Sequence, residues 1–398
     1  MIQFGYIWKE SGRKVKEFFR FQILRKMVNI EPVLYIGIYQ SLFAGLLIST
    51  KKPYTFANRV MAAWLFIFCV EMIFALLNSK VIEMYSFPFI TFTYGPLLFL
   101  YISFMTNPGK RFKPIELIHF VPFFVFFTVS VIFRSEPLVS DLGGFFRPDK
   151  FISLRIVYSV SFFLSITAYS ILSFIKIKKH QSNLKNLTSF TSQRITLNWL
   201  NILTISFYVA YFIMFILGGL DILGNYIPFD PYFVIFGFIT LFCIMYSFYG
   251  IKQPVIFGEV LLSEKDGEKK ETEKYIRSGL KETQAEKYLA RLLAYMEAKK
   301  PYLDGNLTIH DLSQKTGISR HHITQVLNET YRKNFFVFVN EYRITEVIKR
   351  FNDPQYINYT ILAIALDSGF NSKTTFNSFF KSQTGQTPSN YREKIAGI

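Results

Sequence analysis

The pattern of hydrophobic and polar residues changes abruptly near residue 250. Before that point, long apolar runs alternate with short polar segments, and each run approaches the roughly 20 residues that a helix needs to cross a bilayer. After it, apolar residues return at three- and four-residue spacings among charged ones, which is typical of amphipathic helices in water. The pattern therefore predicts an all-α chain with two parts that fold in different solvents. Seven apolar runs are predicted to form a seven-helix transmembrane bundle: residues 32–49, 59–78, 86–105, 116–133, 152–175, 195–220 and 231–250.

The polar part begins with a connector rich in Lys and Glu, and a helical pattern follows from about Gln284 to Pro301. Its apolar residues recur on one face, so this helix either docks on the domain that follows or pairs with a second copy in a homodimer. The sequence leaves both alternatives open. We divide the chain into a basic N-terminal segment, a transmembrane domain, a charged connector and a soluble helical domain, which cover residues 1–30, 31–250, 251–283 and 284–398.

The soluble domain contains one motif twice, as LTIHDLSQKTGISRHHITQVLNETY and YTILAIALDSGFNSKTTFNSFFKSQTG. Each copy begins with a threonine that can cap a helix and has a small residue four positions before a glycine. The small residue lets a second helix cross closely, and the glycine permits the positive φ that a tight turn needs. The pattern predicts two helix-turn-helix units, built on Thr308, Ser313 and Gly317 in the first copy and on Thr360, Ala365 and Gly369 in the second.

A long amphipathic helix is predicted between the two copies, from about Asn334 to Phe351. At 1.5 Å per residue it spans about 27 Å. This length suits two adjacent major-groove turns, which lie about 34 Å apart on one face of a duplex.

These motifs resemble the AraC-type transcriptional regulators over about residues 284–398. The segment ILAIALDSGFNSKTTFNSFFKSQTGQTPSNYRE is similar to the C-terminal signature of that family almost throughout. The combination with a multi-span N-terminal half resembles a membrane-bound bacterial subgroup. The resemblance implies a double-stranded DNA partner, base contacts from His321, Thr324, Gln325, Lys373, Thr374 and Ser378, and phosphate contacts that we assign to Arg320, Lys381 and Arg392. The sequence departs from the family at Gln325 and Ser378, where arginine is common, so the affinity of each unit is expected to be reduced.

The positive charge predicts the orientation of the membrane part, because Lys and Arg of short loops favour the cytoplasm. If the seventh span ends in the cytoplasm, the inner loops hold eleven Lys and Arg and the outer loops hold four. A multi-pass protein of the cytoplasmic (inner) membrane with a cytoplasmic C-terminal domain is therefore predicted. The first 26 residues carry seven positive charges on the wrong side for an odd number of spans. They form either an interfacial basic helix or an untranslated segment before a start at Met27, and we favour the second interpretation.

Ionisable residues inside a membrane are candidate functional sites, and Glu71 lies deep in an apolar run. A cluster of Glu71 with His119, Arg155, Asn198 and Asn201 would bind a signal ligand or transmit a shift between helices. The alternative is a hydrogen-bonded packing contact.

Catalytic and metal sites are not predicted. Phosphate-binding glycine loops and a nucleophile-elbow pattern are missing from the sequence, and its five histidines are scattered. We therefore expect a regulator without cofactor, metal or enzymatic activity, whose membrane half senses an unknown ligand or membrane partner. The alternative is a transporter or membrane receptor with a protein-interaction tail.

Overall fold

The computed structural model describes residues 30–52, 54–80, 88–107, 109–133, 149–190, 196–224, 231–252 and 282–396. These ranges are helical, apart from loops and one isolated bridge between Thr188 and Thr308. The predicted all-α fold is therefore confirmed for the described ranges. Contacts divide the chain into two compact units, Met1–Ile177 with Trp199–Ser263 and Lys178–Asn198 with Glu264–Ile398. The predicted alternatives for the first 26 residues, and most of the predicted connector, lie outside the described residues.

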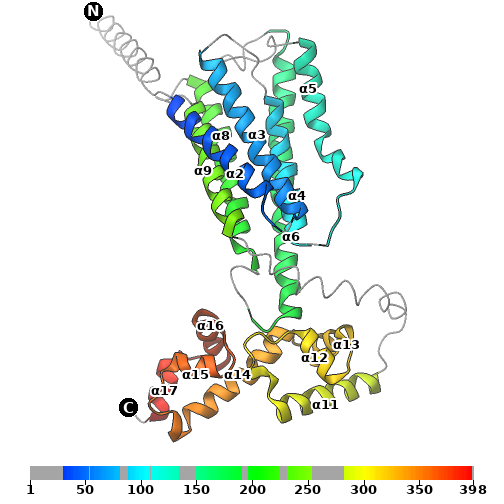
Figure 1. Cartoon of the computed structure of the whole chain (residues 1–398), viewed down its shortest axis with the longest axis vertical. Coiled ribbons are helices and arrows are strands. Elements are labelled where there is room, and N and C mark those ends of the chain that lie inside the picture. Colours follow the sequence, from blue (N-terminus) through cyan, green and yellow to red (C-terminus); the bar gives the residue numbers. More distant parts are fainter. Residues whose placement is uncertain are drawn as a thin grey trace, which may run out of the picture. The chain divides into compact units, whose positions relative to one another are not determined.

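The first unit is a bundle of apolar helices (Figure 1). Its α-helices are α2 (Glu31–Ser49), α3 (Phe56–Lys80), α4 (Tyr94–Met105), α5 (Val121–Phe133), most of α6 (Ile152–Leu187), α8 (Asn198–Gly224) and α9 (Pro231–Lys252). Helix α2 packs on α3 and α9. Close packing depends on its glycines, because a Cβ atom at Gly37 would lie 2.2 Å from Met72 Sδ. Aromatic side chains fill the interior, among them Trp64, Phe68 and Phe207. Many leucine, isoleucine, valine and phenylalanine side chains remain exposed on the outer faces.

Six helices in the described ranges are long and apolar enough to cross a membrane, one fewer than predicted. The difference lies in the third predicted run, 86–105. It forms a 3-10 helix, η1 (Pro88–Thr93), followed by the 12-residue helix α4, and its apolar helical stretch covers only Phe89–Met105. Pro96 has no N–H to donate to the preceding turn, which favours irregular helix at this point. The six long helices are Glu31–Ser49, Phe56–Leu77, Pro114–Phe133, Ile152–Leu187, Asn198–Leu217 and Val234–Ile251.

The second unit contains two small helical subdomains joined by α14 (Phe335–Phe351) (Figure 1). The first comprises α11 (Glu282–Lys299), α12 (Ile309–Thr316), α13 (Arg320–Gln325) and the π-helical turn η4 (Val326–Thr330). The second comprises α15 (Ile361–Asp367), α16 (Lys373–Thr384) and α17 (Pro388–Ala396). Each subdomain has its own core. The N-terminal part of α14 contributes to the first core, and its C-terminal part contributes to the second.

Helix α11 packs on the other helices of the first subdomain, because Leu292 and Met296 are buried in the core that these helices share. This is the first of the two alternatives that the sequence left open, while a homodimer stays a prediction. The proposed domain boundaries also stay predictions. Contacts place Lys178–Asn198 in the second unit, whereas the sequence division had included this segment in the transmembrane domain.

Candidate nucleic-acid interface

The local chemistry of the two repeated motifs builds two helix-turn-helix units. Thr308 Oγ1 accepts a hydrogen bond from the backbone N–H of Asp311 at 3.3 Å, and Thr360 Oγ1 accepts one from Ala363 at 3.1 Å. Both threonines are therefore N-caps, as the sequence predicts. In the turns, Gly317 has φ +67° and Gly369 has φ +96°. These values favour glycine because a Cβ atom is strained in the left-handed region.

In the first helix-turn-helix unit the second helix is α13, which continues into η4. Its inner face is buried through Ile323, Val326 and Leu327. Of the predicted base-contacting residues, His321 is exposed, whereas Thr324 and Gln325 are half-buried. Both half-buried side chains have intramolecular partners. Thr324 Oγ1 donates to Arg320 O at 3.0 Å, and Gln325 Nε2 donates to Glu329 Oε2 at 2.9 Å. A base contact from Gln325 would therefore use the second N–H of its amide or replace the Glu329 carboxylate.

In the second helix-turn-helix unit the corresponding helix is α16. Phe376 and Phe380 bury its inner face in the second core. Lys373, Thr374 and Ser378 are all exposed on the helix. Its first turn is capped by Ser372, whose Oγ accepts from the N–H of Thr375 at 3.4 Å. This helix therefore presents its three predicted base-contacting residues with their side chains open to solvent.

The three predicted phosphate-contacting residues differ in their surroundings. Lys381 is exposed near the C-terminus of α16, and Arg320 is half-buried at the start of α13. Arg392 instead donates to the backbone carbonyls of residues 356, 357 and 359 at 2.6–2.9 Å. Its guanidinium also lies over the Phe351 ring, 5.6 Å from the ring centroid. A phosphate contact from Arg392 stays a prediction and would have to compete with this packing role.

One buried arginine that joins the two subdomains was not predicted from the sequence. Arg343 of α14 is 1% exposed, and its guanidinium lies at the junction of the two subdomains. Its Nε donates to Tyr302 O at 2.8 Å, and its Nη2 donates to Asp304 O at 2.7 Å. Burial lowers the pKa of Arg343 to about 10, against the opposing effect of Asp304, so this side chain stays protonated at neutral pH. A polar signal was visible, because Asn340 and Arg343 interrupt the apolar face of the predicted linking helix.

The predicted intramembrane residues have varied partners. Arg155 donates to Asp149 Oδ1 at 2.8 Å, and His119 Nδ1 lies 3.0 Å from the Tyr169 hydroxyl. Neither of these contacts involves Glu71. The Oε2 atom of Glu71 and the Oδ1 atom of Asn201 are buried without a hydrogen-bond partner among the described residues. Asn198 is exposed and belongs to the other unit. A signal site made of these five residues stays a prediction.

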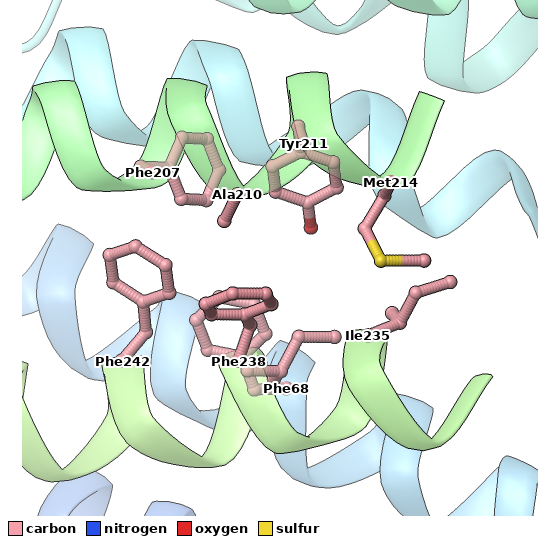
Figure 2. Close-up of a pocket in the computed structure, with 9 residues that line it drawn as sticks. Phe68, Phe207, Ala210, Tyr211, Met214, Ile235, Phe238 and Phe242 are labelled. Carbon is pink, nitrogen blue, oxygen red and sulfur yellow. The ribbon is translucent and has the colours of Figure 1, made fainter. Parts of the chain in front are cut away.

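A small apolar pocket lies between α3, α8 and α9 of the first unit (Figure 2). Most of its lining is aromatic, including Phe68, Phe207 and Phe242. The Tyr211 hydroxyl projects into the space between the helices, and it has no hydrogen-bond partner among the described residues. The pocket therefore joins an apolar wall to one tyrosine hydroxyl that no side chain of the described part satisfies.

Comparisons with known proteins support the assignment of the second unit. The family model described as a helix-turn-helix domain matches residues 312–394. An uncharacterised HTH-type transcriptional regulator of Staphylococcus aureus strain COL is 36% identical over 87 residues, which are 22% of this chain and 11% of that protein. The probable transcription factor PqrA of Proteus vulgaris is 28% identical over 109 residues, which are 27% of this chain and 86% of PqrA.

The chain thus spans only about a tenth of the length of the staphylococcal relatives it matches. No solved structure matches the chain significantly. The family match begins inside α12 and covers α13, α14, α15 and α16, which carry the polar faces described above. It includes both turn glycines and the Thr360 cap, whereas the Thr308 cap lies just before it. Residues 312–394 therefore form a helix-turn-helix domain of the AraC type.

Proposed function

We propose that this protein is a membrane-embedded transcriptional regulator that binds double-stranded DNA sequence-specifically through α13 and α16. The observation that carries the proposal is the pair of capped helix-turn-helix units on one linking helix, each with a buried apolar face and a polar outer face. At 17 residues, α14 is about 26 Å long, which suits recognition helices in successive major-groove turns.

The chemistry of the outer faces supports specific reading rather than general attraction to phosphate. Lys373 can donate to the O6 and N7 acceptors of guanine, and Thr374 can contact the thymine methyl group. Gln325 can pair with adenine once it leaves Glu329. Base contacts of this kind specify sequence, whereas Lys381 and Arg320 would fix the register on the backbone.

The six long apolar helices support a location in the cytoplasmic membrane, with the DNA-binding domain on the cytoplasmic side. The lysines near the end of α6, such as Lys178, Lys179 and Lys185, agree with that orientation. In this proposal the membrane half senses a signal and shifts the DNA affinity of the second unit. Such a shift requires that the signal bind two states of the membrane half with different affinity.

The experiment is the selection of bound duplexes from random DNA by the full chain in lipid nanodiscs. Lys373→Ala and Gln325→Ala are compared with two control variants, Lys299→Ala on α11 and Gln355→Ala, whose side chains are exposed. We expect each of the first two variants to lose preference at one position of the motif, with a cost of about 1–3 kcal/mol. The two controls should keep the motif. If the wild-type chain enriches no sequence at low salt, the proposal is wrong and a protein-interaction tail becomes the better explanation.

A further inference from the structure

A segment from the membrane half of the sequence is built into the DNA-binding unit. Helix α6 ends at Leu187, and Leu187 packs against the core of the first subdomain. The next residue, Thr188, forms an antiparallel bridge with Thr308, the N-cap of α12. Ser189 follows and is completely buried. The end of α6 and residues 188–189 therefore pack as part of the DNA-binding unit.

Ser189 occupies a polar socket, which we define as the Asn340 and Arg343 side chains and the Leu307 carbonyl. The Ser189 N–H and Oγ both donate to Leu307 O, at 3.2 and 2.7 Å. Its carbonyl oxygen accepts from Arg343 Nη1 at 2.8 Å and from Asn340 Nδ2 at 3.0 Å. Its Oγ also accepts from Arg343 Nη2 at 2.9 Å. Five hydrogen bonds thus hold one residue that lies more than 100 positions away in the sequence.

The same arginine holds the junction between the two helix-turn-helix units. A guanidinium has five N–H donors, and all five of Arg343 are used. Two go to Ser189, one goes to Asn340 Oδ1 at 3.1 Å, and two go to the carbonyls of Tyr302 and Asp304. Release of Ser189 would leave two donors of a buried charge without these partners, which is unfavourable.

The segment that carries the Tyr302 and Asp304 carbonyls is also the place where the second helix-turn-helix unit meets the first. Asn371, in the turn of the second helix-turn-helix unit, donates to Asn306 Oδ1 at 2.9 Å. In the same turn, Gly369 packs so closely that a Cβ atom would lie 2.2 Å from Tyr302 O. The socket therefore borders the contact that sets the spacing between α13 and α16.

Docking of Ser189 leaves the predicted DNA-contacting surface open. His321, Lys373, Thr374 and Ser378 are exposed while Ser189 is bound. Docking of Ser189 therefore does not cover these residues. Its effect on DNA binding must act through the contact between the two helix-turn-helix units.

We propose that the Ser189 socket is the site through which the membrane half controls DNA binding. With Ser189 docked, Arg343 holds the two helix-turn-helix units at the spacing that a two-element operator requires. Release of Ser189 loosens that spacing and weakens binding. This inference rests on the proposed function, because it assumes that the second unit binds DNA.

Helix α6 supplies the mechanical connection. It is unbroken over 36 residues, about 54 Å, whereas the apolar core of a bilayer is about 30 Å thick. Only Thr188 separates its last residue from Ser189. Residues 152–177 of α6 belong to the first unit and residues 178–187 to the second. In this proposal, a shift or rotation of α6 in the bilayer changes the docking of Ser189.

The first arm of the test measures docking without DNA. Thr188→Cys and Thr308→Cys are combined in the full chain in lipid nanodiscs. Partners in an antiparallel bridge have Cα atoms about 4.5–5.5 Å apart, which is within disulfide range. A mild oxidant should cross-link the pair rapidly, whereas each single variant should give no cross-link, since the native Cys69 and Cys243 are buried. Absence of the cross-link in the double variant would overturn docking.

The second arm measures affinity for the selected operator. We expect the oxidised double variant to bind at least as tightly as its reduced form. Ser189→Ala removes one acceptor of the buried guanidinium and should weaken operator binding about tenfold. Ser182→Ala, at an exposed serine near the end of α6, should have no effect. Cross-linking that abolishes binding, or Ser189→Ala with wild-type affinity, would overturn the inference. If the wild-type chain binds no specific DNA, the proposed function is wrong, and the cross-link yield still decides whether Ser189 docks.

Discussion

Replacement of Gly369 by alanine tests the junction between the two helix-turn-helix units. Gly369 has φ +96°, and an added Cβ atom would lie 2.2 Å from Tyr302 O and 2.9 Å from Arg343 Nε. A left-handed conformation costs a residue with a Cβ atom about 1–2 kcal/mol. The contact with a backbone oxygen cannot be relieved by a rotamer change, and overpacking of this kind adds about 1–3 kcal/mol. We therefore expect Gly369→Ala to lower the free energy of unfolding of the second subdomain by about 2–5 kcal/mol.

Gly385→Ala is the matched control. Gly385 also has a positive φ, +75°, but its added Cβ atom would meet no atom within 4 Å. Gly385→Ala should therefore lower the free energy of unfolding only by the cost of the left-handed conformation, about 1–2 kcal/mol. The assay is amide hydrogen exchange of α15 and α16 in the full chain, where each 1.4 kcal/mol corresponds to a tenfold change in the opening equilibrium. The difference of about 1–3 kcal/mol predicts exchange about 5- to 150-fold faster in Gly369→Ala than in Gly385→Ala. Equal rates in the two variants would refute the close contact with Tyr302.

Three further perturbations test other parts of the second unit. Thr360→Ala removes the cap on the Ala363 N–H and should destabilise α15 by about 1 kcal/mol, measured by hydrogen exchange, whereas Thr360→Ser should retain most of that stability. Burial raises the pKa of Glu346, but hydrogen bonds and charges of Arg350 and a neighbouring lysine lower it more, so the net shift is downward. Its ionised form therefore stabilises the fold above the unfolded pKa of about 4.3, and this contribution is lost as pH falls through the folded pKa. Unfolding followed from pH 6 to pH 3 should show the stability gap between wild type and Glu346→Gln closing, and a constant gap would contradict the shift. Arg392→Ala should destabilise the second subdomain, since three carbonyls lose their donor, and a loss of DNA affinity with unchanged stability would instead support its predicted phosphate contact.

The helix-turn-helix units could be predicted because their determinants are local. A threonine that caps and a glycine that turns act within a few residues, so Thr308, Thr360, Gly317 and Gly369 were identified from spacing alone. The linking helix was equally predictable, because its apolar residues repeat at helical spacing and Asn334 caps its first turn.

Features that depend on distant residues could not be predicted in the same way. The third apolar run has the composition of a span, but its described helix begins with 3-10 geometry and is too short. Among the hydrogen-bond partners of Arg343, Ser189 is 154 positions away, so no local sequence pattern indicates it. The pairing of Arg155 with Asp149 was not predicted for a different reason, because Asp149 lies in the polar segment before the apolar run that contains Arg155.

The account as a whole depends on two recognition helices that read one duplex together. The most direct measurement is a hydroxyl-radical footprint of the full chain in lipid nanodiscs on its selected operator. The account predicts two protected elements on one face of the DNA, with centres about 10 base pairs apart, because the length of α14 suits recognition helices in successive major-groove turns. Protection of a single element, or no protection at any salt concentration, would contradict it.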